Sequence, residues 1–248
     1  MALSEDGSTI VVTYVFRKKA DILIQTKKGF IFEQSLVGTV QSFGVVMGSS
    51  KSVVINQGKH YLKCFKPDED GLYQLDQTIF SPDRIEDMAL CPAEQYLAFA
   101  TRSNEQHLHQ NNANVFSHLK TYNCPSGYAS FITFSQDCSW LAYICTNKQV
   151  ILYKNIDAFT FIQKMTFPNV PSNVKIGGVD MLVTCQSAAG FNETTSYRYN
   201  GSQFISTTVI PKINLTQISA TPKFTKFAAA LNQQTFIVYS QNNRSISL

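Results

Sequence analysis

The stretch Phe131-Ile132-Thr133-Phe134-Ser135-Gln136-Asp137-Cys138-Ser139-Trp140-Leu141-Ala142-Tyr143-Ile144 consists of an apolar run, a polar turn and a second apolar run. Related phrases occur at residues 2–12 and 88–99. Self-similarity at a fixed period indicates a repeat architecture, and a repeat decides the fold before any single motif does.

The apolar residue before each of these turns recurs at a nearly constant spacing. The anchors lie 44, 43, 44, 42 and 44 residues apart, and they are Leu3, Met47, Leu90, Phe134, Ile176 and Ala220. A period of about 43 residues is typical of a propeller blade of four short strands. We therefore predict an all-β fold, a single β-propeller domain over residues 1–248. Its six four-stranded repeats lie near 1–43, 44–87, 88–130, 131–173, 174–216 and 217–248.

The strands within a repeat differ in polarity. The second is a short apolar run such as Leu141-Ala142-Tyr143, as expected of a strand buried on both faces. The fourth is longer and more polar, as in Phe30-Ile31-Phe32-Glu33-Gln34. The last repeat is incomplete, so either the ring closes as six blades or further sequence completes a larger, seven-bladed ring. An open blade edge invites a strand from another chain.

Several phrases resemble a known repeat family. Phe134-Ser135-Gln136-Asp137 before Leu141-Ala142 resembles the first hairpin of WD40 repeats, as does Leu3-Ser4-Glu5-Asp6-Gly7. The chain is similar to a degenerate WD40-like β-propeller repeat protein, which implies a scaffold for protein–protein interaction. The sequence has no Gly-His or Trp-Asp dipeptide, and Trp140 falls on a second strand, where we expect it to pack between blades. We therefore do not expect this chain to contain the buried Asp-His-Ser-Trp hydrogen-bond network of that family.

Composition limits the classes of partner. The net charge of +4 is mild and gives no nucleic-acid footprint, and no apolar run of about 18 residues predicts a membrane span. The N-terminal residues do not resemble an export signal. The six cysteines form no C-x-x-C pair, which favours reduced, structural thiols. These features predict an intracellular, cytoplasmic protein.

The sequence predicts no catalytic, cofactor or metal site. His107 and His109 share one side of a strand and His118 lies on the next, but their polar, acid-free surroundings favour a solvated outer face. Asp68-Glu69-Asp70-Gly71 reads as a hairpin turn because the calcium-loop spacing is missing. The innermost strands carry hardly any titratable side chain, so we predict that the protein is not an enzyme.

Loops at one end of the predicted ring are the best binding candidates, because rigid scaffolds present function on loops. Arg84, Tyr128 and Phe191 are residue types that dominate binding energy, and they define the predicted protein-binding face.

The leading interpretation is a non-enzymatic interaction scaffold within a larger intracellular assembly, with other proteins as partners and the oligomeric state open. Two alternatives remain at this stage. One is an enzyme with a site in the propeller channel. The other is an ectodomain fragment of a secreted or membrane protein, for which glycans on Asn192 or Asn214, or a disulfide among the six cysteines, would decide. The sequons begin at Asn192, Asn200, Asn214 and Asn243.

Overall fold

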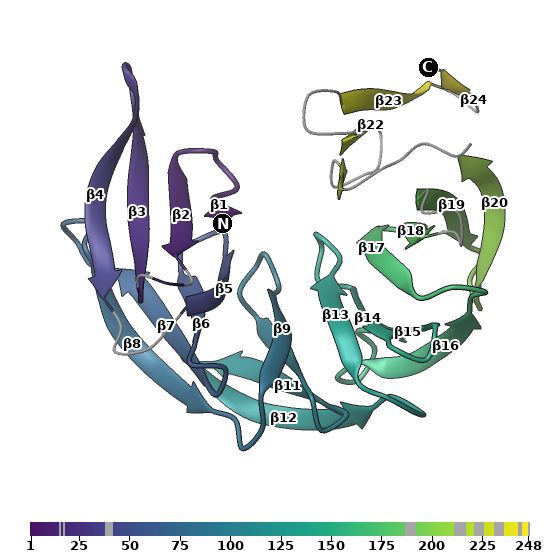
Figure 1. Ribbon diagram of the computed structural model, residues 1–248, viewed down its shortest axis with the longest axis horizontal. Helices are drawn as coiled ribbons and strands as arrows, with labels where there is room; N and C mark the ends of the chain where they lie inside the picture. The colour runs from purple at the N-terminus through teal and green to yellow at the C-terminus, as the bar shows by residue number, and fades with distance from the viewer. Residues whose placement is uncertain are drawn as a thin grey trace. The chain divides into compact units, whose positions relative to one another are not determined.

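The computed structural model describes residues 1–14, 16, 18–37, 42–186, 192–210, 217–220, 226–230, 236–242 and 245–247. Residues 37, 42–43, 186, 192 and those from 208 onward are described by their backbone alone. The chain divides into two compact units, unit 1 (Met1–Asn123) and unit 2 (Cys124–Leu248). Every regular element in the described ranges is a β-strand, and no helix there is long and apolar enough to cross a membrane (Figure 1).

Unit 1 contains three antiparallel sheets, each built from four consecutive strands paired in chain order. Sheet 1 comprises β1 (Ala2–Leu3), β2 (Thr9–Tyr14), β3 (Lys19–Thr26) and β4 (Gly29–Val37). Sheet 2 comprises β5 (Ser42–Met47), β6 (Val53–Gln57), β7 (Tyr61–Pro67) and β8 (Tyr73–Phe80). Sheet 3 comprises β9 (Ile85–Leu90), β10 (Tyr96–Thr101), β11 (Glu105–Asn112) and β12 (Val115–Asn123).

Unit 2 also contains three antiparallel sheets, each built from four consecutive strands. Sheet 4 comprises β13 (Ala129–Phe134), β14 (Trp140–Cys145), β15 (Gln149–Lys154) and β16 (Thr160–Thr166). Sheet 5 comprises β17 (Pro171–Gly177), β18 (Asp180–Gln186), β19 (Asn192–Tyr199) and β20 (Phe204–Ile210). Sheet 6 comprises β21 (Gln217–Ala220), β22 (Lys226–Ala230), β23 (Phe236–Asn242) and β24 (Ser245–Ser247). The last repeat, expected to be incomplete, thus has a fourth strand of three residues.

Apolar side chains between successive sheets form the core. Within each unit the first strands of neighbouring sheets lie next to each other. The second strands β6 and β14 are buried along their whole length, as the sequence predicts, whereas β2 is buried only in part. One cluster joins sheets 1 and 2 and another joins sheets 2 and 3. In unit 2, Trp140 packs between sheets 4 and 5 against Tyr199 and Phe204, which confirms its predicted role between blades.

The same hydrogen-bonded turn opens sheets 1 and 4. In sheet 4, Asp137 Oδ1 accepts hydrogen bonds from the hydroxyls of Ser135 and Ser139, and Ser135 Oγ accepts one from the Trp140 N–H. In sheet 1, Ser4, Asp6, Ser8 and Thr9 make the equivalent bonds. Because Ser and Asp side chains satisfy turn amides locally, the Ser-x-Asp-x-Ser phrase fixes the first hairpin.

Candidate functional site

Arg84 of the predicted binding face lies in unit 1, just before β9. Its Nε is 2.9 Å from Glu86 Oε1, an ion pair without an aligned hydrogen bond, while its Nη2 donates to Glu86 Oε2 at 3.4 Å. The side chain is 38% exposed, so a partner can reach the guanidinium. Because Glu86 already neutralises it, an acidic partner must share or displace that carboxylate.

Tyr128 lies in unit 2 on a segment held by several contacts. Its backbone N–H donates to Thr146 Oγ1 at 3.2 Å, and its carbonyl accepts from the Thr146 N–H at 2.9 Å. Gly127 has φ +73°, and an added Cβ there would lie 2.3 Å from Thr146 Oγ1, so this position requires glycine. Phe191 lies outside the described residues, and a shared face of Arg84, Tyr128 and Phe191 stays a prediction.

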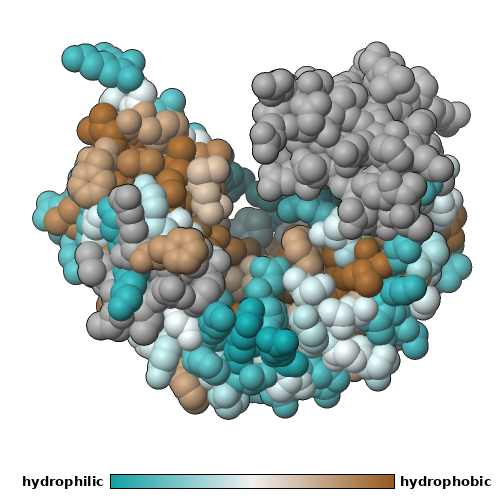
Figure 2. Space-filling model, viewed as in Figure 1, coloured by the Kyte–Doolittle hydropathy of each residue, from teal (hydrophilic) through white to brown (hydrophobic). Residues whose placement is uncertain are grey.

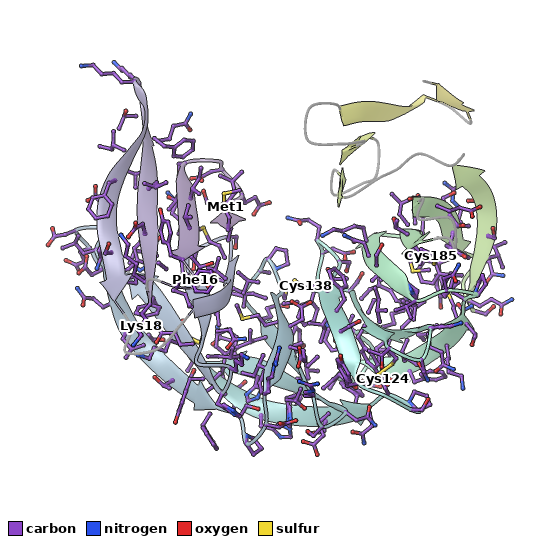
Figure 3. The ribbon with its side chains drawn as sticks, in the orientation of Figure 1. Met1, Phe16, Lys18, Cys124, Cys138 and Cys185 are labelled. Atoms are coloured by element: carbon purple, nitrogen blue, oxygen red, sulfur yellow. A yellow bond between two sulfur atoms is a disulfide. The ribbon has the colours of Figure 1, made fainter. Side chains whose placement is uncertain are left out.

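A disulfide anchors the start of the Tyr128 segment. Cys124, labelled in Figure 3, is bonded to Cys145 at the end of β14, with 5.9 Å between the two Cα atoms. Both residues are buried. The expectation of reduced thiols is therefore wrong for this pair. The two cysteines are 21 residues apart in the sequence, and no local spacing motif links them. In the fold, Cys145 pairs with Ala129 at the start of β13, five residues after Cys124.

Cys64 and Cys185 are free thiols. Burial raises the pKa of Cys64 to about 12, and burial raises the pKa of Cys185 to about 11. Neither thiol is therefore an activated nucleophile, since the thiolate is the reactive form.

The three histidines of sheet 3 cluster as their spacing predicts. The ring centroids of His107 and His118 are 5.9 Å apart, those of His109 and His118 are 5.5 Å apart, and both β11 rings stack on Phe99. The prediction of a solvated face is wrong for His109, which is 7% exposed. Its Cα pairs with that of Leu97, so both point to the face that packs on sheet 2.

Burial and the neighbouring His118 and His107 lower the pKa of His109 to about 4, so the ring is neutral at pH 7. Its Nδ1 is buried without a hydrogen-bond partner in the described structure. Within the described residues, no group of three His, Cys, Asp or Glu side chains converges on a point that could hold a metal ion. The cluster therefore contributes to the packing of sheet 3 against sheet 2.

A recurring glutamine contact joins sheet 1 to sheet 2, sheet 2 to sheet 3, and sheet 4 to sheet 5. In each case a glutamine on the fourth strand of one sheet faces an aromatic residue at the start of the fourth strand of the next sheet. The glutamine carboxamide accepts a hydrogen bond from the backbone N–H of that aromatic residue and donates one to its carbonyl. Donor–acceptor distances range from 2.7 to 3.2 Å. The three pairs are Gln34 with Tyr73, Gln77 with Phe116, and Gln163 with Phe204.

These aromatic residues occupy equivalent positions in the repeat. The pairing of the third and fourth strands shifts register at the same point in sheets 1 to 5, and this bulge aligns the repeats residue by residue. The aligned aromatic residues are Phe30, Tyr73, Phe116, Phe159 and Phe204. All are buried except Phe30, which is 41% exposed. No glutamine of the described residues contacts the Phe30 backbone.

Phe30 is one of several residues on the same face of sheet 1 that are less buried than their equivalents in sheet 2. Sheet 2 buries Val53, Ile55, Phe65 and Tyr73 against sheet 1. By the same register, the equivalent residues of sheet 1 are Ile10, Val12, Leu23 and Phe30. The first three are only half-buried, and the fourth is exposed. We call these four residues the leading face of sheet 1.

The space-filling view agrees with this description. Brown, hydrophobic surface covers sheet 1 at the upper left, and the hairpin of β3 and β4 extends beyond it to a teal tip (Figures 1 and 2). The tip carries Lys27 and Lys28, both exposed. Phe32 is also exposed, but so is Leu75 at the equivalent position of sheet 2, so that exposure is ordinary for the repeat.

The sequence interpretation missed the leading face because it treats β4 as an ordinary outer strand. The detectable signal is the 43-residue spacing of Phe30, Tyr73 and Phe116, combined with that of Gln34 and Gln77.

Two solved structures are similar to the chain. A β-propeller domain of Cps50 (Swd1) from Myceliophteria thermophila aligns with a TM-score of 0.72 and 8% identity over 97% of this chain and 82% of that one. A protein from Lactobacillus plantarum aligns with a TM-score of 0.68 and 11% identity over 84% of this chain and 69% of that one. No family model matches the sequence, and the comparison with curated proteins found no match. The fold is thus a β-propeller built from four-stranded antiparallel sheets, which confirms the predicted fold class.

Proposed function

We propose that the protein is a non-enzymatic interaction scaffold whose leading face of sheet 1 binds a four-stranded β-sheet supplied by a partner protein. The observation that carries this proposal is the exposure of Phe30, because every equivalent aromatic residue in sheets 2 to 5 is buried. A propeller fold supports a scaffold in general, and this face gives the scaffold a specific docking surface.

The chain itself indicates what fits this face. Sheet 1 covers the equivalent face of sheet 2 with a small apolar set, Val11, Ala20, Ile22 and Leu36, and with the Gln34 carboxamide. The expected partner sheet therefore presents short aliphatic side chains and a glutamine on its outermost strand. That glutamine would bind the backbone N–H and carbonyl of Phe30, as Gln34 binds those of Tyr73.

Charge adds a second element of recognition. Lys27 and Lys28 lie exposed in the turn between β3 and β4, next to the leading face. Carboxylates on the partner near this turn would meet two ammonium groups, which favours rapid and selective association more than tight binding.

The test places a photo-crosslinking amino acid at position 30 of the full chain in its own cells. The expected product joins position 30 to a β-strand of another protein that carries a glutamine. Phe30→Asp should weaken capture of that protein at least about tenfold, because a buried aromatic anchor is lost. The matched control is Phe32→Asp on the same strand, which should retain binding because position 32 is solvent-exposed in the repeat.

Each other outcome overturns the proposal. Crosslinks confined to the same polypeptide would mean that the chain covers the face itself. Crosslinks to a second copy of the chain would show that this face mediates self-association and does not bind a different protein. Equal losses for Phe30→Asp and Phe32→Asp would remove the leading face from the binding surface.

The setting of this scaffold is a separate proposal. The sequence predicts an intracellular assembly, and that location stays a prediction. The Cys124–Cys145 disulfide favours the ectodomain alternative, because cytosolic thiols are kept reduced whereas secreted and luminal domains keep disulfides. Peptide mapping of protein alkylated at lysis, without reduction, tests it: free Cys124 and Cys145 would exclude this alternative.

A further inference from the structure

Asn200 lies in a tight turn between β19 and β20, at the start of the sequence Asn200-Gly201-Ser202. The Asn200 N–H donates to the Gln203 carbonyl at 3.0 Å, and Gly201 takes φ +103°. Asn200 Oδ1 accepts hydrogen bonds from the N–H groups of Ser202 and Gln203, each at 3.0 Å. The turn is thus closed by the asparagine carboxamide itself.

The hydroxyl of Ser202 completes this arrangement by donating to Asn200 Oδ1 at 2.9 Å. The carboxamide oxygen is therefore occupied, while Nδ2 makes no hydrogen bond to the described residues. All four turn residues, 200–203, are exposed. The strands on either side are anchored, because Tyr199 and Phe204 pack on Trp140. A large group on Nδ2 would extend into solvent without disturbing the core.

The second observation is the Cys124–Cys145 disulfide in the same unit, because a buried disulfide is typical of folding in an oxidising compartment. In the secretory route, an Asn-x-Ser sequence is an acceptor for N-linked glycans. From these two observations together we infer that Asn200 is an N-glycosylation site. This inference goes beyond the interaction scaffold and does not depend on it, since the leading face lies in unit 1.

The described part of the chain argues against the sequon at Asn192. Its hydroxyl residue, Thr194, is 1% exposed and pairs with Thr184 Oγ1 at 2.9 Å. A glycan beside this buried pair would have to be accommodated near a packed strand, whereas one on Asn200 projects from a turn. The sequons at Asn214 and Asn243 lie outside the described residues.

The reaction is a transfer from a polyisoprenyl-diphosphate-linked oligosaccharide. A bond forms between Asn200 Nδ2 and the anomeric carbon of the first sugar, and the bond from that carbon to the diphosphate oxygen breaks. The diphosphate leaves with the electron pair, and one Nδ2 proton passes to a base of the transferase. No change of oxidation state is involved.

The test uses the full-length protein isolated from its own cells. Treatment with a peptide-N-glycosidase in ¹⁸O-water should convert Asn200 to ¹⁸O-labelled Asp, identified by mass spectrometry of the peptide. Asn200→Gln and Ser202→Ala should each abolish attachment of one glycan, so both variants should migrate faster on a gel by the same increment. Ser206→Ala is the matched control on β20 and should leave the mobility unchanged.

An unmodified Asn200 in the isolated protein would overturn the inference, whether or not the disulfide is found. A glycan on Asn192 with none on Asn200 would overturn it as well. Either failure leaves the docking surface on sheet 1 standing, because the crosslink from position 30 is measured independently.

Discussion

Gln163 binds Phe204 of the neighbouring sheet at both backbone groups: its Oε1 accepts from the Phe204 N–H at 2.7 Å, and its Nε2 donates to the Phe204 carbonyl at 3.2 Å. The first residue of β20 thereby gains a side-chain partner for each of its backbone groups. An interior amide left without a partner costs about 1–3 kcal/mol, so one side chain here satisfies two such groups.

We expect Gln163→Ala to lower the free energy of unfolding by about 1–3 kcal/mol, measured by urea denaturation. Gln163→Glu keeps the shape and one acceptor but cannot donate to the Phe204 carbonyl, so it should not restore stability. Gln203→Ala, one residue before Phe204 and exposed, is the control. Wild-type stability of Gln163→Ala would contradict a role of this contact in joining sheets 4 and 5.

The disulfide gives a second prediction. Joint replacement of Cys124 and Cys145 by alanine removes a link that closes a loop of 21 residues. The chain-entropy model assigns such a loop about 3 kcal/mol, so thermal unfolding should shift to clearly lower temperature. Cys185→Ala, which removes a free thiol, should have a much smaller effect. Equal effects of the two changes would show that the link stabilises nothing beyond ordinary packing.

The sequence predicts those features that depend on local pattern. The period follows from the anchor residues, the hairpin turns follow from phrases such as Ser135-Gln136-Asp137, and the position of Trp140 follows from its place on an apolar strand. Each of these is determined by residues close together in the chain, where periodicity and turn chemistry decide the structure.

The features that the sequence did not predict all depend on contacts between distant residues. Gln77 looks like any polar residue of an outer strand until the register places it beside Phe116. His109 appears solvated until sheet 2 covers it. The exposure of Phe30 has meaning only after the bulges align it with Tyr73. These contacts are determined by the pairing register of the strands and by the packing between sheets. Neither can be deduced from a short stretch of sequence.

The buried histidine predicts a specific pH dependence. Burial, with His118 and His107 nearby, lowers the pKa of His109 from 6.5 to about 4, and Glu105 lies beside His107 on the same strand. Between these values the unfolded chain binds a proton that the folded chain does not. The free energy of unfolding should therefore fall as the pH drops from 6.5 to about 4, by up to about 3 kcal/mol.

Chemical denaturation at several pH values between 4 and 7 measures this slope. His109→Gln should reduce this slope, because the variant has no proton to gain at this position, while His107, whose pKa is also lowered by burial, retains a smaller part of it. Gln110→Ala, one residue further along β11, should keep the wild-type slope. Parallel curves for His109→Gln and wild type would show that another group titrates in this range.

The turn that opens sheet 4 leads to the last prediction. Ser135 Oγ donates to Asp137 Oδ1 at 2.6 Å and accepts from the buried Trp140 N–H at 2.9 Å. Ser135→Ala breaks both hydrogen bonds, and we expect a loss of about 1–2 kcal/mol at pH 7. Ser130→Ala in β13, where the hydroxyl makes only a long contact with the Ile144 carbonyl, is the matched control.

The same variant should change the response to acid. Burial raises the pKa of Asp137, but hydrogen bonds from Ser135 and Ser139 outweigh it and hold that pKa below the ordinary value of 3.8. A carboxylate with a lowered pKa stabilises the folded state above the unfolded pKa and loses that contribution as the pH falls through the folded pKa. Ser135→Ala removes one of these donors and brings the pKa of Asp137 closer to 3.8. The difference in stability between variant and wild type should therefore shrink as the pH is lowered from 7 through this range, whereas a constant difference would mean that Ser135 acts only through the Trp140 amide.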